Sequence, residues 1–109
     1  GDNPTPGMSM TGTSQATIES CPPGVLGPDL RACAAYDGAV TAASTVSCPT
    51  TLILGALDRM TPRKTAQPLV DAIVGATVVE LAASGHAPMM EEPDTVRSVL
   101  GEHLVRATV

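Results

Sequence analysis

Two residues whose side chains can move protons stand shortly after two short apolar stretches. Asp58 follows the stretch Thr50–Leu54, and His86 follows the stretch Thr77–Leu81. A carboxylate that accepts a hydrogen bond from one nitrogen of an imidazole fixes the tautomer of the ring and stabilises the imidazolium that forms during acyl transfer. Taken singly, Asp58 is explained as a turn residue before a helix, and His86 as a loop histidine without a role. Brought together by the fold, they would be a general base and the acid that orients it.

The stretches before these residues predict two parallel strands. Thr50–Leu54 is an apolar run that stops at Gly55, as is typical of a strand buried on both faces. A helical pattern separates it from Thr77–Leu81, and a strand–helix–strand unit of this length makes a parallel pair with a right-handed crossover. Because the carboxyl ends of parallel strands lie at one edge of a sheet, we expect Asp58 and His86 to lie at the same edge.

The helix between the strands has signals at both ends. Thr61 predicts its N-cap, Pro62 its first residue and Gly75 its end. Its apolar face consists of Ala66, Leu69, Val70 and Ile73. Pro68 conflicts with this pattern because a proline inside a helix removes one backbone hydrogen bond. We therefore expect a kink there, or a first turn that ends and restarts.

Two motifs in this region, P-T-T-L-I-L-G-A-L-D-R-M-T-P and S-G-H-A-P-M-M-E-E-P-D, resemble the last third of an α/β-hydrolase. They follow one another in the order and at the separation typical of that family, and the likeness runs from Cys48 to near Leu104. The resemblance implies an α/β fold in which Asp58 is the acid of a catalytic triad and His86 is its general base. The earlier strands of that fold, and the serine elbow between them, have no counterpart in the sequence.

The first 47 residues predict a separate helical segment. We expect short helices over Thr13–Ser20 and Pro28–Tyr36, interrupted by the sequence C-P-P-G, and a connector of small residues over Ala39–Ser47. In proteins that this chain resembles, such a helix pair belongs to the cap that covers the active site. The chain thus divides into a cap segment, residues 1–47, and a core segment, residues 48–109.

The chain ends in an amphipathic helix, predicted over Pro93–Ala107. Its apolar stripe consists of Val96, Val99, Leu100, Leu104 and Ala107. His103 falls on that stripe, which indicates a partly buried structural histidine. Glu91 and Glu92 precede the helix, and we expect them to cap it rather than to take part in acid–base chemistry.

No serine stands in the G-x-S-x-G elbow that a hydrolase nucleophile needs between a buried strand and a helix. Ser9, in the sequence G-M-S-M-T, comes closest, but the G-D-N-P-T-P before it is no strand and Thr11 takes the place of the second glycine. Ser84 has no elbow around it, and Cys33 and Cys48 sit inside or beside apolar elements. We therefore expect the nucleophile to lie outside this chain.

Composition and charge argue against several functions. The formal charge of −5, with six basic residues dispersed along the chain, gives no surface for nucleic acid. No apolar run approaches the roughly 20 residues of a membrane span. Cys21, Cys33 and Cys48 are odd in number and lack a metal-ligand spacing, which favours three free thiols in a reducing, cytoplasmic compartment. Neither a metal nor an organic cofactor is implied.

These observations predict a partial α/β-hydrolase fold with two parallel strands, a crossover helix, a C-terminal helix and an N-terminal helical cap piece. The implied function is that of the C-terminal part of a serine hydrolase acting on an ester, lactone or similar acyl substrate. Two alternatives stay open: a non-catalytic acidic interaction domain that keeps the hydrolase tail as a scaffold, and a complete miniature hydrolase that uses Ser9. Because two strands leave edges and faces uncovered, we expect the isolated chain to dimerise, by pairing strands or by exchanging the last helix, or to pair with the missing N-terminal part.

Overall fold

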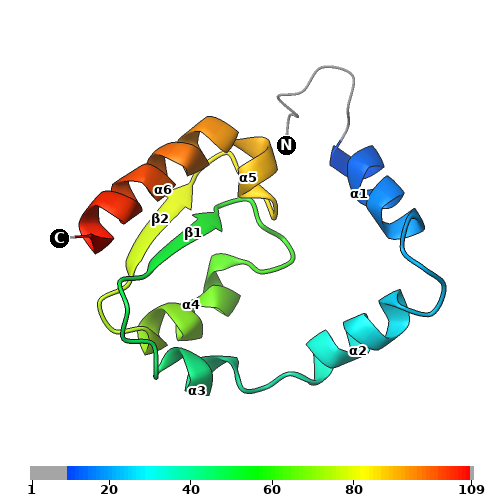
Figure 1. The fold of residues 1–109 in the computed structure, drawn as a ribbon, viewed down its shortest axis with the longest axis horizontal. Helices are drawn as coiled ribbons and strands as arrows, with labels where there is room; N and C mark the ends of the chain where they lie inside the picture. The colour runs from blue at the N-terminus through cyan, green and yellow to red at the C-terminus, as the bar shows by residue number, and fades with distance from the viewer. Residues whose placement is uncertain (1–9, 109) are drawn as a thin grey trace.

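The computed structural model describes residues 10–108, with the backbone alone for Met10, Thr11 and Thr13. Ser9 therefore lies outside the described residues. Figure 1 shows the helices and strands of the described chain. In chain order they are α1 (Met10–Glu19), α2 (Leu26–Ala35), α3 (Ala39–Ala43), β1 (Thr51–Gly55), α4 (Arg63–Ala72), β2 (Thr77–Leu81), α5 (Pro88–Glu91) and α6 (Pro93–Ala107).

The two strands form a parallel sheet. Their register runs from Thr51 opposite Thr77 to Gly55 opposite Leu81. The prediction of a parallel pair is confirmed. Strand β2 has its predicted bounds, and β1 starts and ends one residue later than predicted because its pairing with β2 begins at Thr51 and includes Gly55. Both strands end at the same edge of the sheet, so the loops that follow them lie there together.

The crossover helix α4 begins later than predicted. Its first residue is Arg63 and its N-cap is Pro62, which makes no side-chain capping bond. The predicted N-cap, Thr61, instead turns its hydroxyl and its amide toward Asp58. Pro68 lies inside one uninterrupted helix, so the expected end and restart of the helix does not occur.

The strand pair lies between α6 and α4 (Figure 1). The buried hydrophobic side chains that form the core are Ala43, Ile73, Leu81 and Val99. The sequence predicts a connector over Ala39–Ser47, but its first five residues form α3, which packs against α4. The segment A-V-T-A-A is rich in alanine, the strongest helix former, and this propensity explains the difference.

Helix α6 has its predicted bounds, but it buries a narrower face than predicted. Val99 is buried, whereas Leu100 and Leu104 are 52% and 63% exposed. A two-stranded sheet offers too little surface to cover the whole apolar stripe. His103 lies on the covered side, with its Nδ1 2.9 Å from the hydroxyl of Thr51 on β1, so the prediction of a partly buried structural histidine is confirmed.

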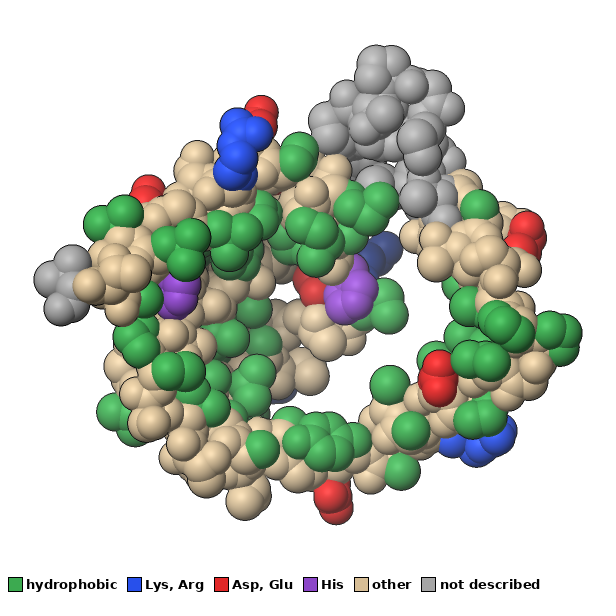
Figure 2. Space-filling model, in the orientation of Figure 1, with side chains coloured by type: hydrophobic (Ala, Val, Ile, Leu, Met, Phe, Trp, Pro, Cys, Tyr) green, Lys and Arg blue, Asp and Glu red, His purple; other side chains and the backbone are tan. Residues whose placement is uncertain are grey.

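Helices α1 and α2 form an arm that extends away from the strands and bends around an open space (Figures 1 and 2). Both helices begin a few residues earlier than predicted. Several apolar side chains of the arm are exposed, among them Ile18 at 52% and Leu30 at 60%. None of the helices in the described part of the chain has the length and apolar character that a membrane span requires.

Candidate active site

The loops after β1 and β2 are held against each other by their backbones. The Leu57 amide donates to the Ser84 carbonyl over 2.9 Å. Gly55 is buried where the loops meet, and a Cβ built on it would lie 2.6 Å from the Ser84 carbonyl oxygen. A side chain does not fit there, so glycine at the end of β1 lets the loop of His86 approach the loop of Asp58.

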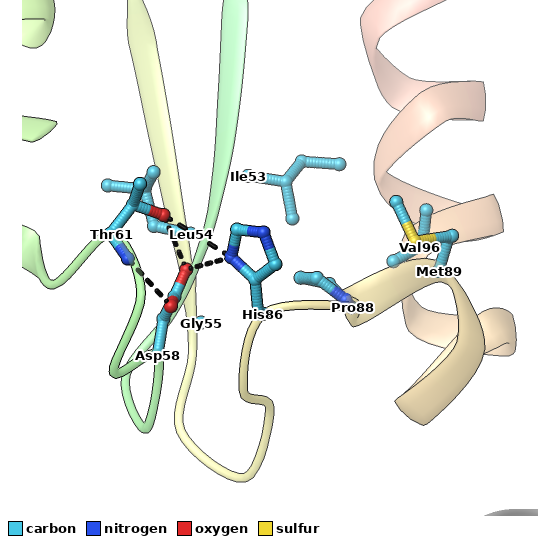
Figure 3. Close-up of a pocket in the computed structure, with 9 residues that line it drawn as sticks. All are labelled: Ile53, Leu54, Gly55, Asp58, Thr61, His86, Pro88, Met89 and Val96. Atoms are coloured by element: carbon cyan, nitrogen blue, oxygen red, sulfur yellow. Dashed lines mark hydrogen bonds and ion pairs between the residues drawn. The ribbon is translucent and has the colours of Figure 1, made fainter. Parts of the chain in front are cut away.

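The structure brings Asp58 and His86 into hydrogen-bond contact, as Figure 3 shows. The distance between His86 Nδ1 and Asp58 Oδ2 is 2.9 Å. The Asp58 side chain is 9% exposed and that of His86 is 51% exposed. In the tautomer that carries its proton on Nδ1, the imidazole donates to the carboxylate and its Nε2 is free to accept a proton. The prediction that the two residues lie at the same edge of the sheet is confirmed.

The carboxylate of Asp58 accepts further hydrogen bonds from the turn that follows it. The Thr61 hydroxyl donates to Oδ2 over 2.7 Å, and the Thr61 and Met60 amides donate to Oδ1 over 2.9 and 2.8 Å. These donors, the Thr61 hydroxyl first, hold the pKa of Asp58 well below its usual range. The Thr61 hydroxyl also lies 3.4 Å from His86 Nδ1, so it borders both members of the pair.

Glu91 and Glu92 bind the loop of His86 with their side chains. Glu92 occupies the N-cap position of α6, but the prediction that the two carboxylates cap the helix is wrong. No side-chain capping bond is present at the start of α6. Glu91 accepts hydrogen bonds from the Gly85 amide over 2.7 Å and the Ala87 amide over 3.1 Å. Glu92 Oε1 accepts the Ser84 hydroxyl over 2.6 Å. These bonds join the loop before α5 to the last residue of α5 and to the residue after it.

Sequence reasoning assigned Thr61 and Glu91 to helix caps and missed their contacts in the site. A threonine three residues after an aspartate is a recognised turn pattern, and that signal points to Thr61. No local pattern identifies Glu91, because its partners are backbone amides of an irregular loop.

Ser84 does not present a nucleophile to His86. It is fully buried, and its hydroxyl is committed to Glu92. The three cysteines are exposed and unpaired, so the prediction of free thiols is confirmed. Within residues 10–108, no three histidine, cysteine, aspartate or glutamate side chains are grouped closely enough to hold a metal ion.

A pocket of about 230 Å³ opens beside His86 (Figure 3). Its other walls are mostly apolar and come from β1, α5 and α6: Ile53, Leu54, Pro88, Met89 and Val96. Of the described residues that line it, none is a serine or a cysteine. A nucleophile that uses His86 from within this pocket would have to enter it from elsewhere. A second pocket, of about 600 Å³, is lined by both His86 and Ser14. Ser14 stands inside helix α1 and has no elbow between a strand and a helix around it.

Comparison with known proteins gives one informative likeness. The chain is 36% identical over 62 residues to a protein of Klebsiella pneumoniae named "Putative carbamate hydrolase RutD". The chain is therefore similar to part of a protein that carries a hydrolase name. The matched region makes up 57% of this chain and 23% of the relative, so the chain spans less than a quarter of the length of that protein. No protein-family model and no solved structure matches the chain.

Proposed function

We propose that this chain supplies the acid and the general base of a serine-type hydrolase. Asp58 is the acid, His86 is the base, and the nucleophilic serine comes from outside this chain. The observation that carries the proposal is the 2.9 Å contact between His86 Nδ1 and a carboxylate that is 9% exposed. The hydrolase-like name of the similar Klebsiella protein supports the same class of reaction.

In this mechanism His86 Nε2 takes the proton of the serine hydroxyl as its oxygen attacks the carbonyl carbon of the substrate. The imidazolium that forms is stabilised by Asp58, which three donors of its own loop keep ionised. The proton then passes to the leaving oxygen or nitrogen as the bond to the carbonyl carbon breaks. Water, activated by the same base, cleaves the acyl-enzyme and returns the serine hydroxyl.

The substrate class is an ester, lactone or similar acyl compound. The printed name of the Klebsiella relative adds carbamates to that class. Each of these has a carbonyl carbon open to the same attack, and the chemistry requires no metal or organic cofactor. The three exposed, unpaired thiols fit a reducing cytoplasmic compartment.

The main alternative is a non-catalytic acidic domain that keeps the hydrolase tail as a scaffold. A scaffold requires no particular arrangement of Asp58 and His86, and side chains more than about 5 Å apart would favour it, because a side-chain hydrogen bond needs roughly 3 Å. The distance of 2.9 Å favours the catalytic pair.

The hydrolase also needs a partner for the open side of the sheet. No other strand among the described residues pairs with the outer edge of β1. We propose that the part carrying the serine pairs with this edge, that the arm of α1 and α2 acts as its cap, and that the chain dimerises through the same edge when it is alone.

A chimera tests the catalytic proposal. Residues 48–107 would replace the corresponding segment of the Klebsiella relative, and hydrolysis of a chromogenic ester and a chromogenic carbamate would be measured. We expect hydrolysis that is abolished by His86→Ala and lowered by up to about 10⁴-fold by Asp58→Asn, the effect typical of replacing a triad acid by its amide. His103→Ala removes the other histidine and should leave the rate within a few-fold. A folded chimera whose hydrolysis does not depend on His86 contradicts the proposal.

The isolated chain gives a second test. We expect it to have negligible esterase activity. No serine or cysteine lines the pocket of about 230 Å³ beside the imidazole, and Ser14, which lines the second pocket, has no elbow around it. Ester hydrolysis by the purified chain that disappears in His86→Ala would show that the nucleophile lies within it. Ser9→Ala would then test the miniature-hydrolase alternative directly.

A further inference from the structure

The carboxylate of Glu91 lies against the backbone on both sides of His86. Its Oε2 accepts the Gly85 amide over 2.7 Å, and its Oε1 accepts the Ala87 amide over 3.1 Å. Both acceptors belong to one side chain, so the backbone of the residue between the two amides is fixed at both ends. Glu91 does not line the pocket of about 230 Å³ beside the imidazole. It lines a second pocket, on the side of α1, together with His86 and Ala87.

The carboxylate is itself anchored in a helical turn. Glu91 is the last residue of α5, and the Ala87 carbonyl accepts the amides of Met90 and Glu91 over 2.9 and 3.0 Å. Ala87 is thus bonded through both its amide and its carbonyl. The next carboxylate, Glu92, holds the fully buried Ser84 at the other end of the loop. The loop is thus bonded at Ser84, at Gly85 and at Ala87.

A carboxylate suits this place better than other polar side chains. It has two equivalent acceptor oxygens, and hydrogen bonds to a charged acceptor are stronger than those to a neutral one. The amides of Gly85 and then Ala87 lower the pKa of Glu91, so the ionised form persists below the usual range. Gly85 leaves the necessary room, because a Cβ on it would lie 3.1 Å from Glu91 Oε1.

We propose that Glu91 is a positioning residue that holds His86 in register with Asp58 by binding the two backbone amides that flank the histidine. This proposal rests on the proposed function, since only a catalytic histidine requires a fixed place against its acid. Without Glu91 the loop can shift away from β1, and the contact of 2.9 Å between the imidazole and the carboxylate becomes one of several arrangements.

Nuclear magnetic resonance on the chain tests this without any substrate. Amide exchange would be measured at Gly85 and Ala87, and ring nitrogen shifts would report the tautomer of His86. We expect Glu91→Ala to speed exchange at both amides by at least about tenfold, the effect of losing a bond to a charged acceptor, and to mix the His86 tautomers. Glu91→Gln keeps one acceptor oxygen, so one of the two amides should stay protected.

Two internal references separate a local effect from a global one. Glu102→Gln makes the same change of charge on the exposed side of α6 and should change neither readout. The ring of His103, bonded to Thr51, should keep its shifts in every folded variant. If Glu91→Ala unfolds and the His103 signals move, Glu91→Gln decides the question.

The outcomes also separate this proposal from the catalytic one. A native chain in which His86 lacks the Nδ1-protonated tautomer contradicts the catalytic pair, and the positioning role fails with it. If the native chain has this tautomer, and both Glu91 variants keep the tautomer and the protection of the two amides, the positioning role alone is contradicted. Loss of the tautomer in the Glu91 variants, with the His103 signals unchanged, supports both the catalytic pair and the positioning role.

Discussion

The carboxylate of Asp58 accepts three hydrogen bonds from its own turn in addition to the contact with His86. Thr61 donates two of them, and its hydroxyl shares Oδ2 with the imidazole. This arrangement keeps the acid ionised and orients the oxygen that faces the histidine. Residues that follow Asp58 in the sequence therefore keep it ionised and orient it independently of the loop of His86.

Replacing Thr61 with valine should raise the pKa of Asp58, because the Thr61 hydroxyl is the largest cause of its lowering. A carboxyl whose pKa is lowered by folding stabilises the folded state above its ordinary pKa, and this contribution is lost as the pH falls through the lowered value. Thr61→Val brings the pKa of Asp58 in the folded chain closer to its ordinary value. The stabilisation is therefore smaller, and acid unfolding should begin at a higher pH. Carbon-13 titration of the Asp58 carboxyl measures the shift directly.

Thr61→Ser is the matched control for this prediction. It keeps the hydroxyl and the backbone amide, and it should titrate like the native chain. An Asp58 titration curve that is the same in Thr61→Val and in the native chain would mean that the two amide donors suffice and that the hydroxyl has no electrostatic role.

Among the residues of the site, the sequence predicted that Asp58 and His86 lie together. It did not predict the contacts of Thr61 and Glu91 that support them. The proximity of Asp58 and His86 follows from the parallel strands that precede them, which have a clear apolar signal. The contacts of Thr61 and Glu91 depend on which of several competing hydrogen-bond partners each polar side chain binds. Spacing along the chain cannot decide between a helix cap and a loop contact that are both within reach.

Among the elements, the end of β1 controls how closely the two loops approach. Gly55 lies under the loop of His86, and a Cβ there would collide with the Gly85 carbonyl and lie 2.6 Å from that of Ser84. Backbone atoms cannot rotate aside as a side chain can. The acid and the base therefore meet only if this position carries no side chain.

Gly55→Ala should separate the two loops and destabilise the fold by about 1–3 kcal/mol, the usual cost of forcing an extra carbon into a packed site. The histidine tautomer should change as the contact with Asp58 is lost. Gly101→Ala is the matched control, because a Cβ at that exposed position in α6 would have no atom within 4 Å beyond its chain neighbours and the backbone of its own helix. It should stabilise the helix by about 0.5–1 kcal/mol. Urea unfolding of both variants measures the contrast, and equal effects at the two sites would contradict it.

The elements themselves were predicted unevenly. Strand β2 and helix α6 have their predicted bounds because their patterns are regular and their ends are marked. Helix α5 was missed because a four-residue turn has no periodicity to detect. The apolar stripe of α6 was misjudged at Leu100 and Leu104, since periodicity shows which side chains are apolar but not how much sheet is available to cover them.

The whole chain exposes more surface than a closed domain of its size. Its accessible surface is 7800 Å², whereas a compact monomer of this mass exposes roughly 5,600 Å². Its radius of gyration is 16.0 Å, against about 13 Å for a compact domain of this length. The arm of α1 and α2 and the uncovered face of α6 explain the excess (Figure 2). Such a chain gains stability by covering these surfaces with another polypeptide.

The outer edge of β1 is the place where another strand can be added. The Thr50 carbonyl accepts the Thr77 amide, and the Ala56 amide donates to the Leu81 carbonyl, so the residues that flank β1 on either side direct these groups toward β2. Because strand residues alternate in direction, the backbone groups of Ile53 point to the opposite edge. The strand sequence T-L-I-L-G carries no charge that would discourage pairing.

We expect the isolated chain to dimerise through this edge, and Ile53→Pro to prevent it. Proline removes the outward amide that a second strand requires, while the bonds from β1 to β2 use other residues. Ile53→Ala loses the same side-chain packing but keeps the amide, so it should still dimerise. Sedimentation velocity at tens of micromolar measures the difference. A native chain that is monomeric under these conditions contradicts the prediction. An Ile53→Pro variant that dimerises as Ile53→Ala does also contradicts it, because the apolar faces of the arm and of α6, and not the edge of β1, would then form the dimer.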